Sequence, residues 1–101
     1  MTRYDKLVRD KIPEVIRRKG VEPKTHVAGD EEYWAKLKEK LTEEVKEFLA
    51  SENAEEIADI LEVIEAICER KGFRMEEVLR LKSVKLDQRG AFKEKIILEE
   101  A

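Results

Sequence analysis

The sequence is poor in cysteine and histidine and has no long apolar run, and each of these absences bears on the class of protein. Its 101 residues include one cysteine, Cys68, one histidine, His26, and no apolar run near the roughly 18 residues of a membrane span. A single cysteine excludes an internal disulfide framework and is typical of a reducing compartment. The N-terminal stretch also lacks the apolar segment of a signal peptide. We therefore expect a cytoplasmic protein with no membrane partner.

An excess of one charge is also missing. The chain carries 21 Lys and Arg against 24 Asp and Glu, for a net charge of −3. Proteins that bind nucleic acid polymers are usually strongly basic, so this class is disfavoured. A hydrophobic fraction of 42% argues against disorder. The length predicts one domain, residues 1–101, and so small a chain buries little surface alone, which favours oligomerisation.

Hydrophobic periodicity predicts a mostly helical chain. Helix-stopping glycines and residues that favour helix N-termini divide it into segments. Two segments rich in β-formers, residues 24–28 and 94–99, are expected to pair as a small two-stranded ribbon that includes His26. The expected helices are a short one from Pro13 to about Gly20, one over 31–50 capped by Asp30, one from the Asn53 cap to Lys71, and one from Arg74 or Met75 to Gln88.

Acidic residues cluster on either side of a short polar break between the two longest predicted helices. On helical spacing, Glu44 borders the apolar face of the first helix and Glu47 lies just outside it, next to Glu43. Glu56 falls inside the apolar arc of the second helix, with Asp59 at its edge. An antiparallel hairpin would then place Glu47 opposite Glu56 and Glu44 opposite Asp59, so that four carboxylates converge.

Such a cluster requires compensation, because two bare charges 4 Å apart repel by about 4 kcal/mol at an effective dielectric of 20. Protonation, Lys or Arg partners, or divalent cations would supply it. Oxygen-only ligands favour Mg²⁺ or Mn²⁺ over zinc. Structural explanations exist for single acids: Glu56 could complete a capping box with Asn53, and Glu44 could pair with Lys40.

The acidic pattern resembles a known signature. Glu43–Glu44–x–x–Glu47 followed by Glu56–x–x–Asp59 is similar to the E-E-x-x-E … E-x-x-D motif of the MazG superfamily, which are all-α nucleotide pyrophosphohydrolases. The opening YDKLVRDKIPEVI and the closing RGAF followed by KEKIILEE resemble a subgroup described as phosphoribosyl-ATP pyrophosphohydrolase-like. Eight residues separate Glu47 from Glu56, where many members have a longer gap.

The resemblance implies an all-α, MazG-like helical bundle completed by dimerisation. It also implies a Mg²⁺ site, with Mn²⁺ as an alternative ion, in which the ligands are Glu44, Glu47, Glu56 and Asp59. Glu43 matches the signature too and would orient or deprotonate the attacking water. The catalytic set is then Glu43, Glu44 and Glu47.

Cations at the two ends of the chain are candidates for phosphate binding. Lys82, Lys85 and Arg89 form one stripe on the last predicted helix, and a guanidinium can bind two phosphate oxygens at once. Arg9 and Lys11 are further candidates by resemblance to the subgroup opening. A solvated helix face that balances the acids is the simpler explanation for any single lysine.

The resulting hypothesis is a metal-dependent nucleotide pyrophosphohydrolase. It would cleave a nucleoside triphosphate or related nucleotide between the α and β phosphates. Its biological role would be to clear non-standard nucleotides. One alternative is the phosphoribosyl-ATP reaction of histidine biosynthesis, and another is a non-catalytic helical dimerisation module.

Overall fold

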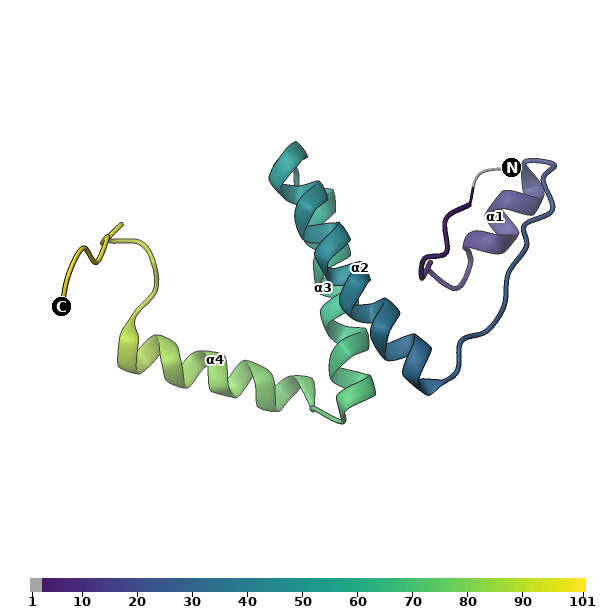
Figure 1. The fold of residues 1–101 in the computed structure, drawn as a ribbon. Coiled ribbons are helices and arrows are strands. Elements are labelled where there is room, and N and C mark those ends of the chain that lie inside the picture. Colours follow the sequence, from purple (N-terminus) through teal and green to yellow (C-terminus); the bar gives the residue numbers. More distant parts are fainter. Residues whose placement is uncertain (1–2) are drawn as a thin grey trace.

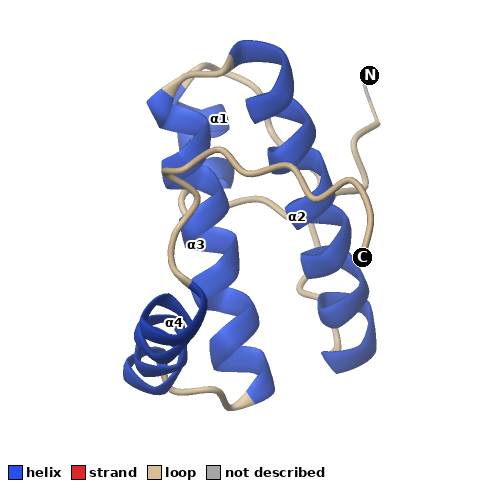
Figure 2. Ribbon diagram, turned by 90° about the vertical axis from the view of Figure 1, so that its left-hand side faces the viewer, coloured by secondary structure: helices blue, strands red, loops and turns tan. Residues whose placement is uncertain are grey.

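The computed structural model describes residues 3–101, and within them the regular structure is helical throughout. The prediction of an all-helical domain is confirmed. Helices α2 and α3 lie side by side as an antiparallel hairpin, whereas α4 extends away from it (Figures 1 and 2). The elements are α1 (Ile12–Arg18), α2 (Asp30–Ser51), α3 (Ala54–Lys71) and α4 (Met75–Arg89).

The ends of the hairpin helices follow from local chemistry. The side chain of Asn53 accepts a hydrogen bond of 3.4 Å from the backbone N–H of Glu56 and so caps α3 as predicted. Gly72 ends α3 in the left-handed region, with φ 76°. The predicted cap of α2 is wrong, because Gly29 takes that position. Asp30 is the first helical residue, and its carboxylate pairs instead with Arg70 at 2.9 Å.

The core of the hairpin is small. Leu37 of α2 is 1% exposed, and Val63 and Cys68 of α3 are also buried. Cys68 is therefore a core residue of the hairpin. None of the helices in residues 3–101 has the combination of length and hydropathy that crossing a membrane requires.

The predicted two-stranded ribbon is wrong. Residues 24–28 and 94–99 are both irregular in the structure. Val27 is 98% exposed and Ile97 is 82% exposed, so neither segment has an apolar surface to pack against. A lone ribbon without such packing is marginal in water, which is why β propensity does not decide here. His26 is accordingly not a strand residue, and its Nε2 lies 3.0 Å from a carboxylate oxygen of Glu32.

The chain is extended for its length. Its radius of gyration is 17.9 Å and its axes measure 56 × 31 × 24 Å. A compact domain of this length would have a radius of gyration of about 13 Å. Helix α4 has no buried residue and projects from the far end of the hairpin (Figure 1). Large apolar side chains are left exposed on the three long helices: Val45, Leu49, Ile57, Leu61, Leu79, Leu81, Val84 and Leu86.

Candidate metal centre

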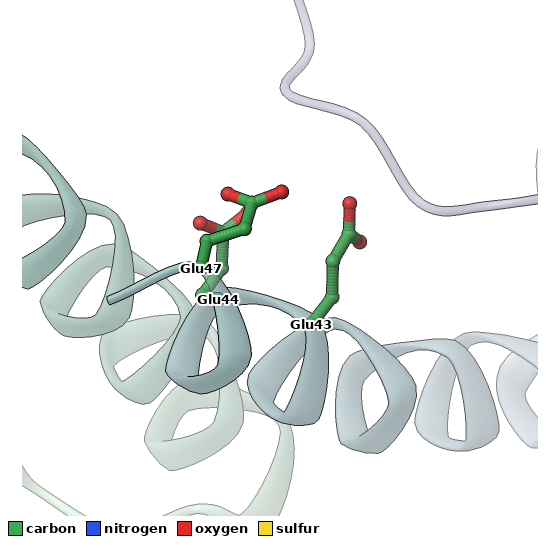
Figure 3. Close-up of side chains that lie close together, drawn as sticks. All are labelled: Glu43, Glu44 and Glu47. Carbon is green, nitrogen blue, oxygen red and sulfur yellow. The ribbon is translucent and has the colours of Figure 1, made fainter. Parts of the chain in front are cut away.

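The hairpin brings acids from both helices together. One group of carboxylates consists of Glu43, Glu44 and Glu47 on α2, and a second joins Glu44 to Glu56 and Asp59 on α3. Within each group, one oxygen from every residue lies within 4.8 Å of the others. The three α2 carboxylates project to the same side of the helix, toward the N-terminal segment (Figure 3). Glu44 belongs to both groups and is therefore the centre of the cluster.

Glu44 is a buried acid with one unpaired carboxylate oxygen. The residue is 5% exposed, and its Oε2 has no hydrogen-bond partner among the described residues. Its Oε1 lies 3.2 Å from the ammonium of Lys40. Burial raises the pKa of the Glu44 carboxyl; Lys40 acts in the opposite direction, and the nearby Glu47 adds to the rise. Ionisation of the Glu44 carboxyl therefore costs free energy in this site.

Glu43 has the opposite electrostatic environment. Its carboxylate oxygens lie 3.0 Å from Nζ of Lys6 and 3.4 Å from Nζ of Lys40. Burial acts to raise the pKa of Glu43, but the two ammonium groups outweigh it and hold the pKa below its ordinary value. The hydrogen bond to Glu43 in turn raises the pKa of Lys6. Glu43 is therefore ionised at neutral pH, with its carboxylate engaged by the two lysines.

The N-terminal segment also reaches α3. A guanidinium nitrogen of Arg9 donates to Asp59 at 2.8 Å, and another lies 3.8 Å from Glu62. The hydrogen bond to Asp59 raises the pKa of Arg9. Of the two predicted N-terminal cations, Arg9 therefore contacts the acids, while Lys11 is exposed at the N-cap of α1.

The hairpin register predicted from the sequence is close to that of the structure. Glu44 lies with Asp59, as expected, but also with Glu56. Glu47, which was expected to face Glu56, falls instead in the group on its own helix. The alternative capping box is half present: Asn53 caps the backbone of Glu56, while the N–H of Asn53 donates to a serine hydroxyl at 3.5 Å. The Glu56 side chain is thereby left to the cluster.

The predicted stripe of α4 lies elsewhere. Lys82, Lys85 and Arg89 are exposed, and among the described residues no ion pair joins them to the acids of the same chain. Helix α4 leads them away from the hairpin (Figure 1).

Lys6 is a residue of this site that was not predicted from the sequence. It is 37 positions before Glu43 in the chain, yet the two side chains form an ion pair. The imbalance of charge along the chain carries a signal for it, since residues 1–19 hold seven Lys or Arg against three acids. That imbalance indicates that the basic opening contacts the acidic middle, without naming the residues.

The chemistry of the donor set fits a hard divalent cation. Every candidate ligand is a carboxylate, from helices that fix its position, and no His or Cys of the described chain enters either group. Such oxygen ligands suit Mg²⁺ and Mn²⁺. The open Oε2 of Glu44 adds a buried atom that a cation would satisfy.

Comparison with known proteins leaves the family open. No family model matches the chain, and no solved structure matches it. An uncharacterized protein of Mycolicibacterium smegmatis (strain ATCC 700084 / mc(2)155) is 52% identical over 46 residues. The aligned stretch covers 46% of this chain and 47% of that relative, so the chain spans about half of the relative's length.

Proposed function

We propose that this protein is a Mg²⁺-dependent nucleotide pyrophosphohydrolase of the MazG type. Its reaction is the hydrolysis of a nucleoside triphosphate, or a related nucleotide, between the α and β phosphates. The observation that supports it best concerns Glu44. Its buried carboxylate belongs to both groups of acids, and one of its oxygens has no hydrogen-bond partner among the described residues. Mn²⁺ is the alternative ion.

The free-energy cost of burying the Glu44 carboxylate with one oxygen unpaired is the physical reason to propose a metal. A buried polar atom without a partner costs about 1–3 kcal/mol, and a charged one more. Lys40 compensates one oxygen of Glu44 and leaves the other open. A divalent cation held by the signature acids would compensate the second oxygen and the mutual repulsion together. The ligands proposed are Glu44, Glu47, Glu56 and Asp59, of which Glu44 belongs to both groups of acids, Glu47 to the α2 group, and Glu56 and Asp59 to the other.

The chain's own residues supply the rest of the reaction. A water oxygen attacks the α phosphorus, and the bond from that phosphorus to the bridging oxygen breaks, so that pyrophosphate leaves with the bridging oxygen. The role proposed for Glu43, which Lys6 and Lys40 hold ionised, is to orient the water or to accept its proton, and the lowered pKa of Glu43 favours the first. A bound Mg²⁺ would lower the pKa of the water and offset the charge that develops on the phosphates.

Dimerisation is part of the proposal. The exposed apolar residues of α2, α3 and α4 and the large radius of gyration favour a partner that covers them. A second copy would complete a helical bundle around the hairpin. It would also carry the α4 stripe of Lys82, Lys85 and Arg89 to the neighbouring acids, where these cations would bind phosphate together with Arg9 and Lys11.

The test is a nucleotide panel assayed for pyrophosphate release with Mg²⁺ and with Mn²⁺. It includes the canonical triphosphates, non-standard ones and phosphoribosyl-ATP, so that house-cleaning and the histidine-pathway reaction are separated. Glu65→Gln is the matched control for glutamine substitutions within the two groups of acids, because Glu65 lies exposed on α3 outside both groups.

The competing function is a non-catalytic dimerisation module, which the exposed apolar side chains also favour. Metal response separates the two. A site that binds the ion at a hundred times its Kd gains about 2.7 kcal/mol of stability. A dimer that is unchanged in melting temperature by Mg²⁺ and Mn²⁺, and that releases no pyrophosphate from any nucleotide, would support the module and refute the enzyme.

A further inference from the structure

A cavity of about 200 Å³ lies beside the acidic cluster, between the N-terminal segment and α2. Glu43 is part of both the cavity wall and the α2 group of acids. The cavity thus adjoins the α2 group of acids at Glu43. Its lining residues are Tyr4, Asp5, Lys6, Leu7, Lys36, Glu39, Lys40 and Glu43.

The charges that line this cavity are balanced in the metal-free protein. Three lysines face three acids, and the two lysines nearest the cluster are engaged by Glu43. Lys36 donates to the backbone oxygen of Asp5 at 2.8 Å and lies 3.2 Å from Glu39. In this state the cavity has no net attraction for an anion.

A divalent cation on the α2 acids would change that balance. It would compete with Lys40 for Glu44, and its charge would repel the ammonium of Lys6, which lies beside the same acids. Two positive charges would be added beside the cavity, and the hold of the acids on Lys6 and Lys40 would be weakened, so that both ammonium groups could turn toward an anion. The cavity would then carry a net positive charge next to the ion.

We propose that this cavity is a subsite for the pyrophosphate end of the substrate, in which Lys6, Lys36 and Lys40 bind the leaving phosphates once the metal is in place. The inference rests on the function proposed above and extends it to an ordered mechanism: metal first, then the phosphates. The size agrees with it, since cavities for whole drug-sized ligands measure about 300–1,000 Å³. A volume near 200 Å³ suits a fragment such as pyrophosphate rather than an entire nucleotide.

Lys6 gives the sharpest test, because its two roles predict changes of opposite sign. In Lys6→Met, Mg²⁺ should bind more tightly than in the wild type, since an ammonium group that repels the ion has been removed from beside the α2 acids. Pyrophosphate should bind more weakly to the Mg²⁺-saturated variant, by roughly ten- to a hundred-fold, the value of one charge-assisted hydrogen bond. A lysine that merely anchors the N-terminal segment would weaken both when it is lost.

The experiment is calorimetric titration of Mg²⁺ alone, and then of pyrophosphate at one fixed Mg²⁺ concentration, into the full chain. Fixing Mg²⁺ makes the metal–pyrophosphate complex in solution the same for every variant. Lys6→Arg keeps the charge and should restore pyrophosphate binding. Lys46→Met is the matched control, since Lys46 lies exposed on α2 and does not line the cavity.

The outcomes separate the two levels of the proposal. Opposite shifts in Lys6→Met, with Lys46→Met unchanged, support the subsite. Normal Mg²⁺ binding and hydrolysis, with pyrophosphate affinity unchanged in Lys6→Met and Lys36→Met, overturn the subsite and leave the proposed function intact. Absence of Mg²⁺ binding by the wild type overturns both.

Discussion

Replacement of Glu44 by glutamine should stabilise the metal-free protein. The glutamine keeps the shape of the side chain but removes a charge from a position that is 5% exposed. Leaving a buried polar atom unsatisfied costs about 1–3 kcal/mol and more when the group is charged, so glutamine removes only the extra cost of the charge. The substitution also loses the ion pair of Glu44 with Lys40, but Lys40 keeps Glu43 as a partner at 3.4 Å. We expect a net gain of about 1 kcal/mol, which raises the melting temperature by about 4–8 °C for a domain of this size.

The pH dependence of this gain follows from the raised pKa of Glu44. Between the ordinary pKa of the unfolded chain and the raised pKa of the fold, the native state binds more protons than the unfolded state. Wild-type stability therefore falls as pH rises through that window. Glutamine does not titrate, so its advantage is full above the raised pKa of Glu44, declines as pH falls through the window, and is gone below the ordinary pKa of the unfolded chain.

The assay is thermal unfolding followed by circular dichroism in EDTA, at pH 8 and at acidic pH. Glu65→Gln is the control, because Glu65 is exposed on α3 outside both groups of acids and its loss should change stability by less than about 0.5 kcal/mol. Addition of Mg²⁺ should then stabilise the wild type and leave Glu44→Gln unchanged. A Glu44→Gln protein that melts below the wild type at pH 8 in EDTA would refute the reasoning, since Glu44 would then be a structural ion-pair partner of Lys40.

Three further results are expected. Glu47→Gln or Asp59→Asn should abolish hydrolysis and metal-induced stabilisation while the helical signal remains, and full activity in both would contradict the assigned site. Light scattering at micromolar concentration should give the mass of a dimer, and a strictly monomeric mass would rule out the bundle. Alanine at Arg89 should weaken binding of a non-hydrolysable nucleotide roughly ten- to a hundred-fold at fixed Mg²⁺, measured by calorimetry. Alanine at Lys82 or Lys85 should have smaller effects, and wild-type affinity in all three variants would mean that the stripe is a solvated face.

The long helices could be predicted from the sequence because their signals are local. Periodic apolar residues, the Asn53 cap and the Gly72 stop act within a few residues of each helix end. The cap of α2 was predicted wrongly for the same reason, since Asp30 has a long-range partner in Arg70 that no local rule contains. The ribbon failed because strand pairing depends on a surface to pack against, and residues 24–28 and 94–99 have none here.

The candidate site was predictable in part. The clustering of Glu44 with Asp59 follows from helical spacing and a hairpin with a short turn, both of which can be read from the sequence. The contacts of Lys6 and Arg9 with these acids could not be located, because they depend on the path of an irregular segment. The burial of Glu44 was only indicated by its position at the border of an apolar face.

The short turn between α2 and α3 restricts how the spacing of the acidic motif can change. Only Glu52 and Asn53 separate the two helices, and eight residues lie between Glu47 and Glu56. One added residue in either helix would rotate everything beyond it by about 100° and move carboxylates off the shared face. Lengthening both helices by one turn adds roughly seven residues and restores both the facing and the axial alignment. The tip of the hairpin can therefore be lengthened only by about one turn in each helix at a time. The interval between the two halves of the motif is thus expected to change in steps of about seven residues.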